Sequence, residues 1–297
     1  MECKTFVMVK QVPDTSNISG EVMRPDGTVN RGKLPTVFNP DDKVALELAL
    51  QVRDRFGGKV TAVTMGPPKA AELLRDCLYM GADDACLITD RRFGGADTLA
   101  TSYILSEAIK KLGPFDLIFA GRQAIDGDTA QVGPQTAEKL GIPQITCAEE
   151  IIDLEEDKIV VKRRIDGGCE TLESTMPLLI TVVNEAATPR PFKARSLMAL
   201  KKARARTELE AMPEASASAE ELDKLIAAYT SRGLYIQTLD CDDLGVELER
   251  CGLQGSPTKV YKVESVVLSG KGHEQFPPTS EGIGDLLDSL IGEHFFG

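Results

Sequence analysis

The sequence predicts a doubly wound α/β fold with a mostly parallel sheet, and two observations support this. Short runs of apolar and β-branched residues alternate with segments of helical periodicity through the first half of the chain. Glycine follows most of these helical segments, which is typical of helix ends. Strands that alternate with helices form parallel sheets through right-handed crossovers.

The expected strands and helices follow one another in pairs. After the first strand comes a long loop rich in Pro, Gly and Asn, which ends near residue 40. The predicted strands are residues 5–10, 60–63, 85–88 and 115–120, and the predicted helices are residues 41–56, 70–80, 98–112 and 130–140.

The pattern changes after residue 150. Residues 158–165 and 169–175 flank Asp166-Gly167-Gly168, which predicts an antiparallel hairpin. Residues 177–183 form a continuous apolar run, and we expect this strand to rejoin the sheet. Two further helices are expected at 220–230 and 282–296 within an irregular C-terminal extension.

Composition excludes several classes of protein. The chain has 297 residues and a net charge of −12, from 34 basic and 46 acidic residues. Bulk charge of this sign argues against binding to nucleic acid or to an anionic membrane. No stretch approaches the roughly 18 apolar residues of a membrane-spanning helix, and the first residues do not resemble a signal peptide. We therefore expect a soluble, cytoplasmic protein.

Common catalytic and metal-binding patterns are absent from the sequence. The seven cysteines are scattered without a CxxC pair, and the only histidines are His273 and His294. This argues against a disulfide framework, a zinc site and a Ser-His-Asp triad. A Walker loop and a dinucleotide fingerprint on a first βα turn are missing as well.

The ligand of such a sheet binds beyond the carboxyl ends of its strands. The most informative strand end is residues 121–133, where Gly121 would let a ligand approach the backbone and Arg122 supplies positive charge. Asp128 and Thr129 could cap the next helix, whose free amides would bind phosphate. An ordinary βα loop with good caps explains the same residues equally well.

Three other strand ends also carry residues that could contact a nucleotide. Thr98 and Thr101 share one face of a helix that Asp97 could cap, and their hydroxyls could meet a phosphate or a ribityl chain. Asn39 could bond to a base or a ribose, and Met65 ends a strand in a kinked loop. Surface threonines and a plain turn are the simpler alternatives for each loop alone. Together the four loops favour a nucleotide site.

The sequence also contains a long gapped motif. It reads Val161-x-Arg163-x-x-Asp166-Gly167-Gly168-x-Glu170-x-Leu172, followed by Pro177-x-Leu179-Ile180-Thr181. Through this motif, and through residues 9–14, 39–40, 80–83 and 121–126, the sequence resembles the β (small) subunit of electron-transfer flavoproteins. The resemblance covers residues 4–202 and, more loosely, residue 239 to the C-terminus.

The resemblance implies an electron carrier that acts only as a heterodimer with an FAD-containing α subunit. Ordinary members hold AMP in the β subunit, and the electron-bifurcating branch holds a second FAD that takes a hydride from NADH. The pattern from Asp97 to Ser102 is similar to the bifurcating branch, which favours FAD over AMP. The implied partners are then an acyl-CoA dehydrogenase-type flavoprotein and ferredoxin or flavodoxin. The alternative is an AMP-containing subunit that relays electrons between a dehydrogenase and a quinone-linked acceptor.

The resemblance also assigns contacts, and it implies no catalytic side chain and no metal. The expected cofactor-binding residues are Met8, Asn39, Met65, Asp97, Thr98, Thr101, Gly121, Arg122, Gln123, Ala124, Ile125, Asp126, Gly127, Asp128, Thr129, Ala130, Gln131 and Val132.

A basic segment between residues 189 and 207 contains no acidic residue. A solvated helix face is the default interpretation, but in the family this region recognises dehydrogenases. The candidate docking residues are Arg190, Lys193, Arg195, Leu197 and Met198. We therefore divide the chain into a nucleotide-binding domain at 1–188 and a part at 189–297 that docks partners and wraps the α subunit. Residues 204–235 look like an insertion, whose role as a lid, a partner contact or an excursion stays open.

Overall fold

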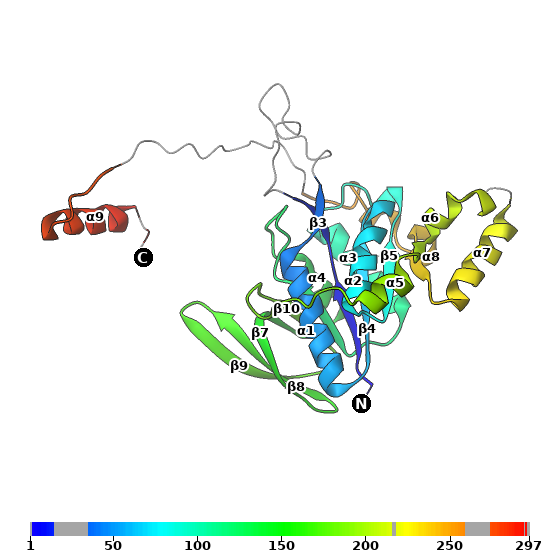
Figure 1. The fold of residues 1–297 in the computed structure, drawn as a ribbon, viewed down its shortest axis with the longest axis horizontal. Coiled ribbons are helices and arrows are strands. Elements are labelled where there is room, and N and C mark those ends of the chain that lie inside the picture. Colours follow the sequence, from blue (N-terminus) through cyan, green and yellow to red (C-terminus); the bar gives the residue numbers. More distant parts are fainter. Residues whose placement is uncertain (1, 15–34, 216–217, 259–273, 294, 296–297) are drawn as a thin grey trace, which may run out of the picture.

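The computed structural model describes residues 2–14, 35–215, 218–258, 274–293 and 295, and these ranges contain one large sheet (Figure 1). The sheet has ten strands in the order β11-β12-β5-β4-β1-β6-β10-β7-β8-β9. Their bounds are β1 Lys4–Met8, β4 Lys59–Met65, β5 Asp84–Ile88, β6 Leu117–Gly121, β7 Gln144–Leu154, β8 Lys158–Ile165, β9 Gly168–Thr175, β10 Leu178–Val182, β11 Arg204–Ala205 and β12 Tyr235–Leu239. Strands β2 (Gln11–Pro13) and β3 (Thr36–Phe38) form a separate antiparallel pair.

Strand β1 is the point at which the order of the sheet reverses. It pairs in parallel with β4 on one side and with β6 on the other, so that Met8 lies opposite both Val63 and Ala120. The chain adds β4 and β5 on one side of β1 and then crosses to add β6 on the other side. A crevice opens beyond the strand ends at such a switch point.

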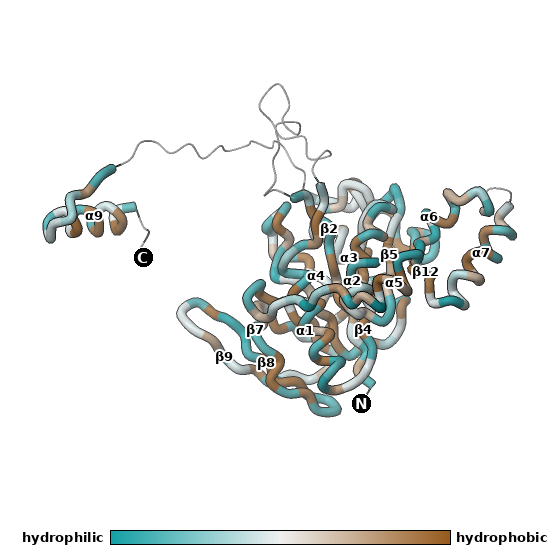
Figure 2. The backbone as a smooth tube through the Cα atoms, viewed as in Figure 1, coloured by the Kyte–Doolittle hydropathy of each residue, from teal (hydrophilic) through white to brown (hydrophobic). Residues whose placement is uncertain are grey.

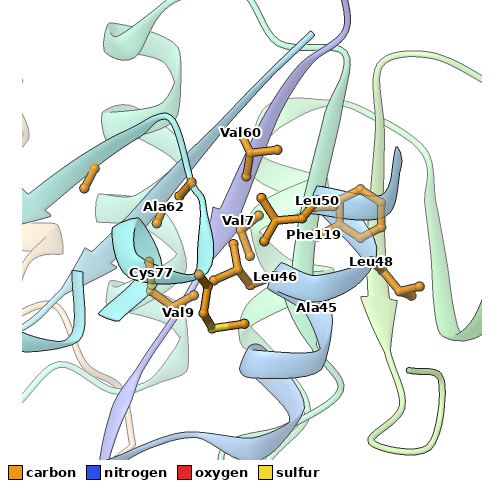
Figure 3. Packing of buried hydrophobic residues seen from close by; sticks show 14 of the residues in the cluster. Val7, Val9, Ala45, Leu46, Leu48, Leu50, Val60, Ala62, Cys77 and Phe119 are labelled. Carbon is orange, nitrogen blue, oxygen red and sulfur yellow. The ribbon is translucent and has the colours of Figure 1, made fainter. Parts of the chain in front are cut away.

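Helices cover both faces of the sheet. One core cluster joins α1 (Pro40–Phe56) and α2 (Ala71–Met80) to the sheet, and the other joins α3 (Thr98–Leu112) and α4 (Val132–Leu140) to it. Alternate residues of β1 point to opposite faces: Val7 lies in the first cluster, and Phe6 and Met8 lie in the second. Figure 3 shows the first cluster, with Leu46 and Leu50 of α1 near Val7 and Phe119. All four of these residues are fully buried.

The predicted fold class is confirmed, as is the hairpin of β8 and β9. Three sheet strands were missed: β7, β11 and β12. β7 lacks a clean alternating pattern because its pairing with β8 shifts register and Cys147 has a positive φ of 59°. β12 pairs in parallel with β5, and the two-residue strand β11 pairs with β12 at the other edge of the sheet. The chain beyond residue 189 thus adds strands to this sheet, and the division at residue 189 stays a prediction.

The C-terminal third also contains several shorter helices. These are α5 (Ala194–Leu200), α6 (Arg206–Glu210), α7 (Ala219–Ser231), α8 (Cys241–Leu244) and α9 (Ser280–Gly292). In Figure 1, α6 and α7 project from the β12 edge of the sheet, within the predicted insertion. In Figure 2, α9 carries brown, apolar residues on one side, and Ile283 and Ile291 are exposed there. No helix of the described residues is long and apolar enough to cross a membrane.

Arg190 ties the segment before α5 to α1. Its backbone N–H, Nε and Nη2 donate to the Glu47 carboxylate at 2.8–3.0 Å, and its Nη1 donates to Asp54 at 2.8 Å. Glu47 is 4% exposed. Burial alone would raise the pKa of Glu47, but the bonds from Arg190 hold it below its ordinary value. Arg190 is therefore occupied inside the chain and is not a free cation for docking.

Replacing only one partner of this ion pair should destabilise the fold. We expect Arg190→Met to lower the free energy of unfolding by about 3–5 kcal/mol, because it leaves a buried carboxylate without its cation. The double variant Arg190→Met/Glu47→Met should recover most of the loss, since it removes both charges. Urea unfolding at pH 7 measures both values. Equal losses in the single and double variants would show that the pair does not carry the stability assigned to it.

Candidate functional site

A cavity of about 1010 Å³ lies where β1, β4, β5 and β6 end. Its size is at the upper end of the range of about 300–1,000 Å³ that is usual for ligand pockets. It gathers sixteen of the eighteen predicted cofactor residues. Those that line it are Met8, Met65, Asp97, Thr98, Thr101, Gly121, Arg122, Gln123, Ala124, Asp126, Gly127, Asp128, Thr129, Ala130, Gln131 and Val132. Asn39 and Ile125 do not line it.

Asp42, in the first turn of α1, joins the two strand ends at the switch point. Its Oδ2 accepts a hydrogen bond from the N–H of Lys10 at 2.8 Å, and its Oδ1 accepts one from the N–H of Gly121 at 3.0 Å. A Cβ on Gly121 would lie 2.4 Å from Asp42 Oδ1. Glycine is therefore required at position 121 for the approach of Asp42, whereas the contact of Gly121 with a ligand stays a prediction.

Asp42 is a site residue that the sequence interpretation missed. The side chain is 7% exposed, and burial raises the pKa of its carboxyl to about 7 despite the hydrogen bonds that favour the charged form. The only signal in the sequence was an acidic pair after Pro40, which is ordinary for a first helical turn.

Asn39 holds the loop that forms one wall of the cavity, although it does not line the cavity itself. Its side chain is completely buried; Nδ2 donates to the carbonyl of Gln123 at 2.8 Å, and Oδ1 accepts from the N–H of Ile125 at 3.2 Å. The expected bond from Asn39 to a base or ribose is therefore replaced by bonds that hold the loop after β6. Asn39 thus shapes the cavity without reaching it.

The loop between β6 and α4 presents backbone donors. In the described chain, the N–H groups of Thr129, Ala130 and Gln131 donate no hydrogen bond to a protein acceptor. Asp128 and Ala130 have positive φ values of 49° and 53°, a conformation that is strained for alanine. Free amides next to a helix N-terminus form an anion site suited to phosphate or pyrophosphate.

The predicted caps of α4 were wrong. The helix begins at Val132 with Gln131 at the N-cap position, and no side chain caps it. Asp128 instead accepts a bond from Gln123 Nε2 at 2.9 Å. The first amides of the helix are consequently left for another partner.

Several charged side chains near the cavity lie next to a group of opposite charge. Lys10 Nζ contacts both oxygens of Asp126, at 2.7 and 2.8 Å. Arg122 Nε lies 3.8 Å from Asp41 Oδ2, and the Arg122 side chain is about half exposed. Burial raises the pKa of Asp41, and the nearby Arg122 opposes that shift. No cluster of metal-ligating side chains occurs among the residues described.

The opposite wall is the start of α3. Asp97 caps this helix as predicted, with Oδ1 accepting from the N–H groups of Leu99 and Ala100 at 3.0 Å each. The Thr98 hydroxyl donates to Gln131 Oε1 at 2.8 Å. The Thr101 hydroxyl has no hydrogen-bond partner in the part of the chain that the structure describes. It is the polar side chain on this wall that is available to a ligand.

Helix α6 adds two lining residues that the sequence patterns did not predict. Thr207 and Glu210 belong to the predicted insertion, more than seventy positions after the β6–α4 loop, yet both line the cavity. The buried Thr207 hydroxyl has no partner among the described residues. Only the pairing of β11 and β12 with the edge of the sheet brings α6 here.

The remaining docking candidates lie on or next to α5, which packs on α2. Leu197 and Met198 are 38% and 73% exposed, as an apolar anchor requires. Lys193 precedes the helix, and its backbone N–H donates to Tyr79. With Arg195, which is exposed, these residues stay a prediction for partner docking.

The raised pKa of Asp42 predicts how stability depends on pH. The folded protein holds this proton up to about pH 7, whereas an unfolded Asp releases it near pH 4. The contribution of Asp42 to stability is therefore complete below about pH 4 and is lost as the pH rises to about 7.

Asp42→Asn should remove this loss, so that the difference in unfolding free energy between pH 5 and pH 8 becomes smaller than in the wild type. The variant should also be less stable at pH 5, because one amide donor would face another donor. Urea unfolding at both pH values checks this, with the exposed Asp223→Asn as control. An unchanged pH difference in Asp42→Asn would contradict the assignment.

Comparisons with known proteins identify relatives of this chain. The family profile described as electron transfer flavoprotein domain matches residues 26–224. The electron transfer flavoprotein subunit beta of Clostridium acetobutylicum is 39% identical over 289 residues, covering 97% of this chain and 98% of the relative. The acryloyl-CoA reductase electron transfer subunit gamma of Anaerotignum propionicum is 42% identical, covering 98% and 99%. The caffeyl-CoA reductase-Etf complex subunit CarD of Acetobacterium woodii is 39% identical, with the same coverage.

Proposed function

The chain belongs to the electron transfer flavoprotein family as a β subunit, and from this membership we propose that it binds FAD in the strand-end cavity. It does so as one half of a heterodimer with an α subunit. The electrons come from NADH and are divided by bifurcation between an acyl-CoA dehydrogenase-type flavoprotein and ferredoxin or flavodoxin.

The observation that carries the proposal is the pair of polar walls in one large cavity. The amides of residues 129–131 form an anion site on one wall, and the free hydroxyl of Thr101 lies on the other. AMP has a single phosphate, and the amides of residues 129–131 alone could bind it. A ligand that continues past its phosphates, as FAD does, uses both walls. The volume of about 1010 Å³ supports the larger ligand.

The residues of this chain bind and orient the ligand. When bound, FAD supplies the hydride and electron-transfer chemistry. The amides of residues 129–131 hold the pyrophosphate, and Asn39 fixes the preceding turn. Thr98 and Thr101 hold the flavin side, while Met8 and Met65 provide apolar contact that keeps water out. No side chain here has to act as an acid, a base or a nucleophile.

The relatives support the choice of partner. Two of them carry names that place them in electron-transfer complexes with acryloyl-CoA reductase and caffeyl-CoA reductase. A partner that oxidises or reduces an acyl-CoA thioester is therefore the best supported one for this chain. Exposed Leu197 and Met198 on α5 provide the apolar anchor for docking, and residues 189–297 supply the surface that also wraps the α subunit.

The ligand count of the purified αβ complex tests this function. Two FAD per heterodimer is the expected result, measured from the visible spectrum and by chromatography of the released nucleotides. One FAD together with one AMP would refute the proposal and leave the alternative, a subunit with structural AMP that passes electrons from a dehydrogenase to a quinone-linked acceptor.

Substitution of both threonines should weaken only the FAD of this subunit. Thr98→Val/Thr101→Val removes two hydroxyls at nearly constant volume, and we expect the affinity of that flavin to fall about tenfold or more, since each hydrogen bond contributes about 1 kcal/mol. Flavin retained after gel filtration measures the effect, with Thr230→Val on α7 as a control. Equal loss from the α and β subunits would show that the threonines do not face the flavin of this cavity.

A further inference from the structure

Residues 251–258, which we name the latch segment, lie against the loop that precedes α3. Thr98 and Thr101 at the start of α3 form the side of the cavity that we call the threonine wall. The N–H of Leu253 donates to the carbonyl of Gly94 at 3.0 Å, and the N–H of Thr258 donates to Asp97 Oδ2 at 3.0 Å. The latch segment and the loop are more than 150 positions apart in the sequence. Neither bond is a secondary-structure contact, so both depend on this particular packing.

The hydroxyl of Ser256 is the centre of this contact. Ser256 is 4% exposed, and its Oγ accepts a hydrogen bond from the N–H of Asp97 at 2.8 Å. The same Oγ lies 2.6 Å from the carbonyl of Gly252 and 3.4 Å from that of Gly95. A hydroxyl has one hydrogen to donate, and the shorter distance assigns it to Gly252. One atom thus links the fold of the latch segment to the backbone of Asp97.

Close packing fixes the latch segment in place. Gly252 has a φ of +55°, and a Cβ there would lie 2.1 Å from the carbonyl oxygen of Arg92. Just before the segment, the N–H of Glu247 donates to the hydroxyl of Tyr103 on α3, and the Arg250 guanidinium lies 3.9 Å from the centre of that ring. The segment is therefore held by α3 itself as well as by the loop that begins it.

Asp97 transmits this contact to the cavity. Its carboxylate accepts three backbone bonds, from Leu99, Ala100 and Thr258, and so has little capacity left for a ligand. Its own carbonyl accepts the N–H of Thr101 at 2.9 Å. The position of Asp97 consequently determines where the hydroxyls of Thr98 and Thr101 lie. Asp97 was predicted as a cofactor contact, and its geometry fits a support for its neighbours.

We propose that Ser256 is a positioning residue that acts through Asp97 to place the threonine wall against the flavin end of the ligand. The inference rests on the proposed function, because it assumes that a flavin occupies that end. The amide wall at residues 129–131 belongs to another loop, which Asn39 holds from the opposite side, and the bond between the Thr98 and Gln131 side chains does not involve those amides. Loss of the Ser256 hydroxyl should therefore affect the flavin end of the ligand more than its phosphate end.

Calorimetric titration of the αβ complex, freed of the nucleotide in this subunit, tests the proposal with FAD and AMP as separate probes. Ser256→Ala should weaken FAD about tenfold, the factor that matches one lost buried hydrogen bond. It should change AMP affinity less than about twofold. Thr258→Pro removes the other bond to Asp97 at an exposed position and should act in the same direction. Ser231→Ala, the same substitution at an exposed position of α7, should leave the FAD-to-AMP ratio unchanged.

Hydrogen exchange of the same complex without the nucleotide gives a second readout. The amides of Leu99 and Ala100, which Asp97 protects, should exchange faster in Ser256→Ala than in the wild type or in Ser231→Ala.

The outcomes separate the two claims. A wild type that binds FAD, with a Ser256→Ala variant that keeps its FAD affinity or loses FAD and AMP equally, would overturn this inference alone. A wild-type complex that takes AMP and no FAD in this subunit would refute the proposed function and this inference together.

Discussion

The fold of the site depends on one buried carboxylate at the point where the sheet reverses. β1 and β6 are neighbours whose helices lie on opposite faces, so their ends diverge into a crevice. Asp42 spans that crevice by accepting the N–H groups of Lys10 and Gly121. Two bonds to one side chain, from Lys10 shortly after β1 and from Gly121 at the end of β6, hold the spacing of the cavity floor. Only glycine at 121 lets α1 approach closely enough to make them.

The start of α1 also holds the loop that contains the proposed anion site. Asn39 precedes α1 and is bonded to the loop after β6 through both ends of its amide, while Asp42 is bonded to the last residue of β6 itself. These contacts allow the loop to hold Asp128 and Ala130 at positive φ and to leave three amides free. The strain in the loop is thus balanced by buried hydrogen bonds around it.

The parts of the fold that local patterns encode could be predicted, and the parts that distant pairing creates could not. The four βα units and the β8–β9 hairpin followed from periodicity and glycine stops, because both are short-range signals. The cavity could be placed because parallel strands end on one edge. Thr207, Ser256 and the sheet strand β12 were missed because their roles arise from contacts with residues far away in the sequence. Asn39 was assigned to the site for the wrong reason, since a sequence does not show whether a polar side chain faces a ligand or the protein.

The net charge of −12 is compatible with the anionic ligand that we propose, because the acids around the cavity already have donors. Two amides bond to Asp42, three bond to Asp97, and the Gln123 side chain bonds to Asp128. Cations pair with the other acids of the lining: Lys10 with Asp126, Arg92 with Asp90 and Arg206 with Glu210. The groups that remain for a ligand are the amides of residues 129–131, the hydroxyls of Thr101 and Thr207, and the guanidinium groups of Arg91 and Arg122, which also line the cavity. Amides and cations at the cavity wall can hold phosphate despite the net charge of the chain, because an anion responds most to the donors beside it, and salt screens charges that lie beyond about 10 Å.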